Sequence, residues 1–411
     1  MHVVSKSAFK PRVVFYLPAV IPWWFTNIIV PMIRAVARGG EVHVLVPPFW
    51  SCTGIRPEDL VGCGDLDVTW HILDGEDHPD LRFSKMHAGV VDLVRQIDPQ
   101  LCLCRSADIV TPSAFPGVVR YIMEGHAEPF GTRHWNVQLC DGLFDHGIMP
   151  ALDPSLGDWL ESALSQQWEQ KAATFPFMER DEFLAKAAIP SGKLLLALPL
   201  DFEHAEVFWD QHFPYPNNVE LINALADQLD DDTMLLVTHH PLNAKHLSPE
   251  FLAVNRAVRQ RLDKVRIVHD VAGPDTATRM MLRHCDGMIF GISKCFTTAA
   301  FLGKPMMRLS QFESGDWLGI STELPEFVNA LRSGAARAPA KADALRWFAF
   351  HHANNVIDPL DPELDLTQLM DHAAHPVNPA RWERGLARYF GDASLLSPMP
   401  SDPALPGLCA A

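Results

Sequence analysis

Several signatures of common protein classes are missing from this sequence. Its eight cysteines include no CxxC pair, and it contains neither a G-x-G-x-x-G loop nor a P-loop. No cluster of lysine and arginine accompanies the formal net charge of -16. These absences argue against a zinc or disulfide scaffold, a standard NAD fold, a kinase and a nucleic-acid binder. Scattered cysteines are typical of a reducing compartment, so we predict a cytoplasmic protein.

The length and composition indicate a globular protein of two domains. A chain of 411 residues exceeds what one hydrophobic core usually organises. Apolar residues make up 48% and charged residues 20% of the chain, which excludes wholesale disorder. We interpret the acidic balance, with a sequence pI of about 5.6, as serving solubility.

One uncharged segment, 13–33, resembles a membrane span or a signal peptide. It contains three prolines and a polar Thr-Asn pair, and no small-residue cleavage site follows it. We therefore interpret it as a strand, a loop and a helix that ends at the glycine pair 39–40. Membrane contact is then at most peripheral, through the apolar loop 18–25, on the inner face of the inner membrane.

Strands and helices alternate along both halves, which predicts an α/β fold with parallel sheets. In the first half we expect strands at 13–17, 41–46, 67–72, 101–105 and 134–140, and helices at 27–38, 85–97 and 115–124. In the second half we expect strands at 193–200, 233–238, 265–270, 288–291 and 305–309, and helices at 217–229, 250–262, 275–285 and 294–302. Ligands of such sheets bind at the carboxyl ends of the strands, here in the loops after 200, 238, 270 and 292.

These patterns suggest four parts of the chain. Residues 1–187 are predicted to form an N-terminal Rossmann-like domain that ends in a polar helical segment. Residues 188–340 form the second, nucleotide-binding domain. Helices in 341–395 are expected to pack back toward the first domain. Residues 396–411 read as a flexible tail.

A histidine pair follows the second strand of the second half, in the run Thr238-His239-His240-Pro241. An imidazole at a strand end can donate to a phosphate, and the proline restricts the turn. A capping histidine in an ordinary loop would look the same. Metal binding by His240 and His246 lacks a third ligand at sensible spacing, and we read Asp230-Asp231-Asp232 as a solvated loop, so we predict no metal site.

A serine-led segment, Gly291 to Lys294, precedes the helix that carries Thr297 and Thr298. Ser293 is placed to cap that helix, and a helix start with hydroxyls suits a phosphate. The same pattern serves as a cap without any ligand.

The first half contributes a carboxylate, Asp141, followed by Gly142 at the end of a predicted strand. Such a carboxylate can act as a general base on an acceptor hydroxyl or attack an anomeric carbon. Asp-Gly is also a common turn dipeptide. Trp23 and Trp24 follow the first strand and could offer a surface for an acceptor sugar or simply pack in the core.

Together these segments resemble the bacterial capsule-polysaccharide biosynthesis proteins, a GT-B-type family that includes Kdo transferases. The resemblance runs through most of 130–310. The family's P-L-Q…D, K-x-H-P, serine-led S-T-x-x-x-E/Q-A-L-x-x-G-K-P and E-D-G motifs are similar to Leu198–Asp201, Val237–Pro241, Ser293–Pro305 and Cys140–Gly142. GT-B sialyltransferases, which use CMP-activated acidic sugars, carry a similar trio of signatures.

The resemblance implies a metal-independent glycosyltransferase with two Rossmann-like domains and parallel sheets facing an interdomain cleft. Asp141 and His240 would be catalytic, with Asp141 acting as base if the reaction inverts the anomeric centre or as nucleophile if it retains it. The nucleotide would contact Asp201, His239, His240, Pro241, Ser293, Thr297 and Thr298. No cofactor is implied. The partners would be a nucleotide sugar, with a CMP-linked Kdo-type or nonulosonic acid favoured, and a bacterial surface glycan or glycolipid.

The sequence departs from the family pattern at four places. Asp201 replaces a glutamine, Cys140 replaces the first acidic residue, Thr298 stands for Glu or Gln, and the lysine before His-Pro is missing. These departures leave two alternatives open. One is a GT-B transferase that uses a UDP- or GDP-sugar, and the other is a non-catalytic member that binds a nucleotide or glycan.

Overall fold

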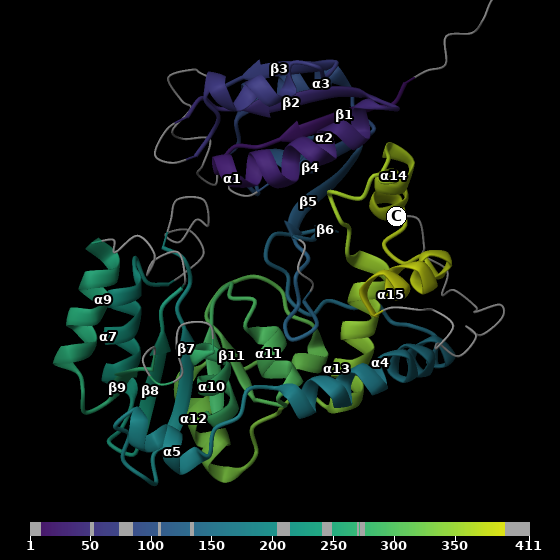
Figure 1. Ribbon diagram of the computed structural model, residues 1–411. Coiled ribbons are helices and arrows are strands. Elements are labelled where there is room, and N and C mark those ends of the chain that lie inside the picture. Colours follow the sequence, from purple (N-terminus) through teal and green to yellow (C-terminus); the bar gives the residue numbers. More distant parts are fainter. Residues whose placement is uncertain are drawn as a thin grey trace, which may run out of the picture.

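The computed structural model describes residues 10–49, 53–73, 85–105, 108–131, 135–203, 214–240, 249–268, 271 and 276–390. The described chain forms two α/β units, one above the other in Figure 1, and the C-terminal helices run along both. Each unit is built on one sheet, of six strands in the first and five in the second. Two α/β units with mostly parallel, Rossmann-like sheets agree with the fold class expected from the sequence.

The first sheet has the strand order β3-β2-β1-β4-β5-β6. Its strands are β1 (Arg12–Tyr16), β2 (Glu41–Val46), β3 (Val68–Ile72), β4 (Leu101–Cys104), β5 (Val118–Glu124) and β6 (Val137–Cys140). All neighbours are parallel except β6, which pairs antiparallel with β5. The order is that of a Rossmann sheet, whose switch point lies between the first and fourth strands.

A nearly continuous helical stretch follows β1, composed of α1 (Pro22–Trp24), the π-helical η1 (Phe25–Ile29) and α2 (Val30–Ala37). It begins earlier than predicted, because Pro22 and Pro31 both stand in the first turn of a helical segment, where a missing N–H costs nothing. The second helix of this unit is α3 (Ala88–Ile97), and short 3-10 turns lie at η2 (Pro57–Cys63) and η4 (Thr111–Ala114).

The prediction of a helix at 115–124 is wrong, because this segment contains strand β5. Gly117 adopts φ +78, and a Cβ there would lie 2.3 Å from the carbonyl oxygen of Pro99. That glycine turns the chain out of η4, and the β-branched pair Val118-Val119 then favours an extended conformation.

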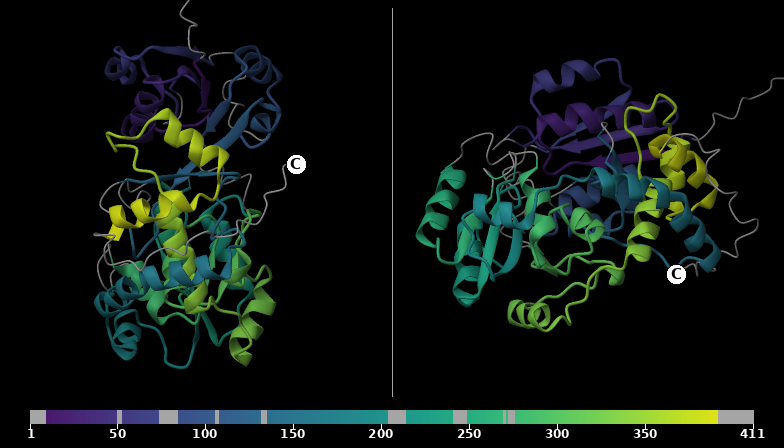
Figure 2. Two further views of the ribbon diagram at one scale, coloured as in Figure 1. Left: turned by 90° about the vertical axis from the view of Figure 1, so that its right-hand side faces the viewer. Right: turned by 60° about the horizontal axis from the view of Figure 1, so that its bottom comes forward.

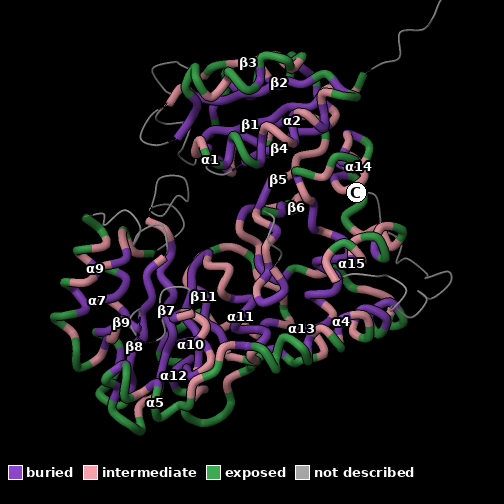
Figure 3. Tube along the Cα trace, viewed as in Figure 1, coloured by how far each residue is buried: buried purple, intermediate pink, exposed green. Residues whose placement is uncertain are grey.

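The second sheet has the order β11-β10-β7-β8-β9 and is parallel throughout. Its strands are β7 (Leu194–Pro199), β8 (Thr233–Thr238), β9 (Val265–Ile267), β10 (Gly287–Phe290) and β11 (Met306–Arg308). Its helices are α7 (Asn218–Gln228), α9 (Pro249–Gln260), α10 (Ala277–His284) and α11 (Phe296–Phe301). The five predicted strands are confirmed, and most are buried on both faces (Figure 3). The sequence analysis missed α12 (Leu324–Ser333), which follows the short η6 (Asp316–Leu318).

The remaining helices connect the two units. They are α4 (Pro154–Thr174), α5 (Arg180–Lys186), α13 (Lys341–Phe350), η7 (His351–Asn355), α14 (Leu366–Ala374), η8 (Pro379–Arg381) and α15 (Trp382–Phe390). Helix α13 lies against α4, whereas α14 contacts α2 and β5 of the first unit. Leu366 and Leu369 of α14 belong to the core beneath the first sheet. The yellow C-terminal segment thus spans the junction in both views of Figure 2. No helix in the described ranges combines the length and the apolar character needed to cross a membrane.

Candidate active site

A cavity of about 490 Å³ lies where the strand ends of the two sheets meet. The first unit contributes Arg105 after β4, the end of β5, and the chain from β6 onward. The second unit contributes the loops after β7, β8 and β10, and α13 with the chain after it closes a third side. The loops after β7 and β10 flank the switch point of the second sheet, which is where doubly wound folds bind their ligands.

Asp201, directly after β7, is a buried carboxylate at this switch point. One of its oxygens accepts a hydrogen bond from the backbone N–H of Ile292, at 3.2 Å. Burial raises the pKa of Asp201 to about 7, although the backbone N–H groups and Arg308 oppose the shift. Near neutral pH much of Asp201 is therefore protonated, so that it can both donate and accept a hydrogen bond, as a glutamine does.

His240 lines the cavity after β8, and its ring lies 5.5 Å from that of Phe202. Burial lowers the pKa of His240 to about 4, so the imidazole is neutral at physiological pH. A neutral imidazole donates one hydrogen bond and adds no charge.

His239, which we expected at the nucleotide, lies elsewhere. Its Nε2 is 3.2 Å from the side-chain amide of Asn255, and its ring packs 4.3 Å from Phe251, both on α9. It is buried and does not line the cavity. Pro241 lies outside the described residues.

Ser293 and Thr297 line the cavity after β10, whereas Thr298 is buried outside it. The hydroxyl of Ser293 accepts a hydrogen bond from the N–H of Cys295 at 3.3 Å, and that of Thr297 donates to the carbonyl of Lys294 at 2.9 Å. Helix α11 begins at Phe296, two residues later than predicted, with Cys295 as its N-cap. A tight turn at 294–295 occupies the start of the predicted helix.

Asp141 stands at the opposite wall, immediately after β6, where the sequence analysis placed it. Its side chain is 77% exposed and forms an ion pair of 2.7 Å with Arg120 of β5. The guanidinium orients the carboxylate at the mouth of the cavity, where an acceptor hydroxyl could reach it.

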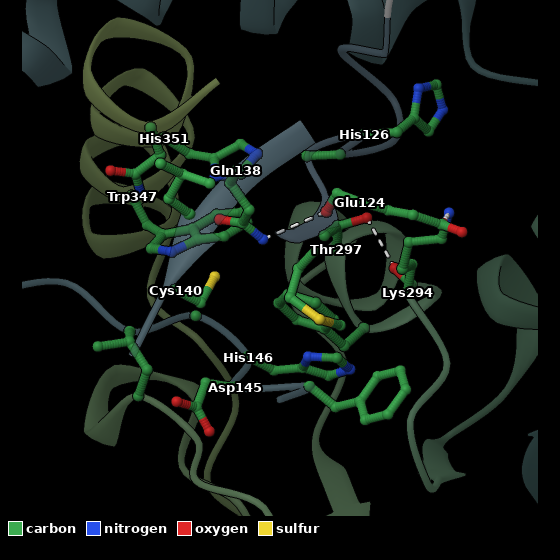
Figure 4. Close-up of a pocket in the computed structure, with 18 of the residues that line it drawn as sticks. Glu124, His126, Gln138, Cys140, Asp145, His146, Lys294, Thr297, Trp347 and His351 are labelled. Carbon is green, nitrogen blue, oxygen red and sulfur yellow. Dashed lines mark hydrogen bonds and ion pairs between the residues drawn. The ribbon is translucent and has the colours of Figure 1, made fainter. Parts of the chain in front are cut away.

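A second carboxylate, Asp145, was missed by the sequence analysis. It lines the same cavity beside Cys140 and His146 (Figure 4). Burial and repulsion from Glu313 raise the pKa of Asp145 to about 6, and Arg308 partly offsets this. A Cβ on Gly142 would lie 2.6 Å from the Asp145 carboxylate, so Gly142 gives it room. The only signal in the sequence was a second acidic residue shortly after Asp141-Gly142.

His146 links the two walls of the site. Its Nε2 lies 3.1 Å from the carbonyl oxygen of Ile292, and its ring stacks 4.3 Å from that of Phe296. Burial lowers the pKa of His146 well below its usual value, so it is a neutral packing residue. It holds the loop after β6 against the loop after β10.

The two tryptophans after β1 do not line the cavity. Trp24 is buried, and the guanidinium of Arg105 lies 3.9 Å above its ring. Trp24 therefore supports a cation that does line the cavity. Trp23 is 41% exposed and packs edge-on against Trp135, with ring centroids 4.8 Å apart. Among the residues described, no group of three His, Cys, Asp or Glu side chains is placed to hold a metal ion.

Comparisons with known proteins return structural likenesses only. No family model and no curated protein matches the chain. The chain is similar to the β-Kdo 2,7 transferase KpsC of Thermosulfurimonas dismutans, at 10% identity and a TM-score of 0.38, over 82% of this chain and 89% of that one.

Two further likenesses have lower TM-scores. A family 9 glycosyl transferase from Veillonella parvula matches at 11% identity and a TM-score of 0.24, over 81% of this chain and 93% of that one. A putative UDP-N-acetylglucosamine 2-epimerase from Listeria monocytogenes matches at 12% identity and a TM-score of 0.32, over 90% and 98%. The residues of the cavity, rather than these likenesses, support the functional proposal below.

Proposed function

We propose that the protein is a glycosyltransferase that moves a sugar from a nucleotide donor to a surface-glycan or glycolipid acceptor. The observation that carries the proposal is one cavity with a carboxylate pair on one wall and the switch-point loops of a Rossmann-like sheet on the other. Glycosyl transfer needs a base for the acceptor hydroxyl and hydrogen-bond donors for the leaving phosphate. The wall with the carboxylates offers the base, and the wall with the switch-point loops offers the donors.

In the inverting form of this reaction, Asp141 takes the proton of the acceptor hydroxyl while the acceptor oxygen attacks the anomeric carbon. The bond from that carbon to the phosphate oxygen breaks, and its electron pair leaves with the nucleotide. In this proposal neutral His240 and Ser293, which line the cavity, donate hydrogen bonds to the leaving phosphate. Thr297 lines the same wall, and its hydroxyl would have to turn away from the Lys294 carbonyl to join them. Arg120 holds the Asp141 carboxylate in place through their ion pair.

We propose a CMP-linked Kdo-type or nonulosonic acid as the donor. The motif resemblance supports this choice, and the state of Asp201 removes one objection to it. A fully charged carboxylate in place of glutamine would repel the nucleotide phosphate, but burial keeps much of Asp201 neutral near pH 7. The donor half of the reaction is assigned to 188–340 and the acceptor half to 1–187.

A transfer assay tests the function directly. The protein is incubated with CMP-Kdo, and separately with UDP- and GDP-sugars, in the presence of membrane glycolipid extracts, and released nucleotide is quantified with product masses. We expect release of CMP coupled to a mass gain on the acceptor. Release of UDP or GDP instead would replace the donor assignment. Binding of a nucleotide without any turnover would support a non-catalytic member of the family and contradict the proposal.

A further inference from the structure

Lys294 is a cation at the proposed phosphate position to which no role has been given. It stands between Ser293 and Cys295 in the loop after β10 and lines the cavity. His240 is neutral, so Lys294 is the one described residue that the loops after β7, β8 and β10 bring to the cavity with a positive charge at pH 7. A phosphate bound against these loops therefore meets one positive charge, that of Lys294.

The other unit supplies the partner of this charge. The Lys294 ammonium forms an ion pair with the carboxylate of Glu124, the last residue of β5. The two side chains reach each other from facing walls of the cavity (Figure 4). They are 42% and 28% exposed, so neither is sealed from an incoming ligand. Pairs of this kind contribute little net stability and are readily exchanged.

Arg105 completes the set of charges around Lys294. It follows β4 at the switch point of the first sheet and lines the same cavity, stacked on Trp24. Burial, together with repulsion from Arg105, lowers the pKa of Lys294 to about 8. Two cations from opposite units thus lie near each other, and an anion between them would relieve their repulsion.

We propose that Lys294 binds the donor phosphate and that Glu124 occupies it only while the phosphate is absent. This rests on the proposed nucleotide-sugar function. Glu124 competes with the phosphate for the ammonium, so donor binding exchanges a contact between the two units for a contact with the ligand. Arg105 faces the same phosphate from the first unit. Donor binding at the loop after β10 thereby breaks a contact with the end of β5.

Titrations with CMP and with cytidine, which lacks the phosphate, test the exchange. We expect Lys294→Met to weaken CMP binding at least about tenfold, because a charge-assisted contact is lost, and to leave cytidine binding unchanged. Glu124→Gln should tighten CMP binding about two- to fivefold, because the competing carboxylate loses its charge. In the Lys294→Met background, Glu124→Gln should have no effect on CMP.

A second ion pair supplies a matched control. Lys341 of α13 pairs with Glu169 of α4 at the surface, outside the cavity. Lys341→Met and Glu169→Gln make the same changes in charge and should leave both affinities at the wild-type value, with thermal unfolding confirming that all variants fold.

Two outcomes would overturn the exchange. One is CMP binding to Lys294→Met with wild-type affinity, and the other is a loss in Glu124→Gln as large as in Lys294→Met. If the wild-type protein bound no nucleotide, the proposed function itself would fail.

Discussion

At the scale of single residues, the two carboxylates after β6 differ in their surroundings although they share one cavity. Asp141 is exposed and paired with Arg120, whereas Asp145 is half-buried beside Glu313. Asp141 is open to an acceptor hydroxyl, whereas the pKa of Asp145, about 6, lies within reach of physiological pH. Asp141→Asn should lower the transfer rate at least about a hundredfold, the usual contribution of a general base.

Asp145→Asn should cost less and should change the acid limb of the pH–rate profile near pH 6, where the Asp145 carboxyl loses its proton. The measurement is the transfer rate of both variants from pH 5 to 8. If Asp145→Asn were inactive and Asp141→Asn retained activity, the two roles would be reversed.

Asp201 allows a test of stability against pH. Its pKa in the folded protein, about 7, lies above the ordinary value of 3.8, so the folded state binds the proton more tightly. The stabilisation of the folded state by this bound proton is complete below about pH 4 and is lost as the pH rises through 7. The free energy of unfolding of Asp201→Asn should therefore rise relative to that of wild type between pH 5 and pH 8, by at most about 3 kcal/mol.

Urea unfolding at the two pH values measures this gain, with the exposed Asp231→Asn as a control that should show none. An equal effect of Asp201→Asn at both pH values would contradict the assigned protonation. The same variant should still bind CMP, because asparagine keeps the hydrogen-bonding pattern of a protonated carboxyl.

At the scale of elements, the junction of β5 and β6 depends on a glycine. A Cβ on Gly125 would lie 2.8 Å from the carbonyl oxygen of Val137, which is backbone and cannot yield. The carbonyl oxygen of Gly125 also lies 2.8 Å from Nε2 of His351 in η7. We expect Gly125→Ala to lower the free energy of unfolding by about 1–3 kcal/mol.

Gly89, exposed in α3, is the matched site, because nothing lies within 4 Å of a Cβ there. Gly89→Ala should be neutral or should raise stability by roughly 0.5–1 kcal/mol. Thermal unfolding of both variants makes the comparison. Equal effects at the two sites would show that the close approach at Gly125 is not what limits substitution.

Local sequence patterns predicted most of the strands, because buried parallel strands read as continuous apolar runs such as 193–200. They failed at β5, whose polar Arg120 and Glu124 broke that pattern. For the candidate site, the patterns pointed to Asp141, His240 and Ser293, which lie in loops after strands and line the cavity. The patterns missed Asp145 and Glu124, because the surroundings of Asp145 and the partner of Glu124 come from segments distant in sequence.

At the scale of the whole molecule, the C-terminal helices complete the first unit. Leu369 of α14 is fully buried in the core that contains β1 and α2. We expect Leu369→Ala to destabilise the protein by about 2–5 kcal/mol, as large-to-small changes in cores do. Hydrogen exchange should show the loss in β1 to β5, far from the mutated residue in sequence. Leu360→Ala, at an exposed site, is the control and should change nothing.

The central claim is that the donor nucleotide binds at the carboxyl edge of the second sheet, in the cavity shared with Asp141. Calorimetric titration of CMP, UMP and GMP into wild-type protein and into His240→Ala tests it most directly. We predict that wild type binds CMP most tightly and that His240→Ala weakens this binding about tenfold, the value of a hydrogen bond to a charged group. Wild-type protein that binds none of the three nucleotides, or a His240→Ala variant with unchanged affinity, would contradict the account.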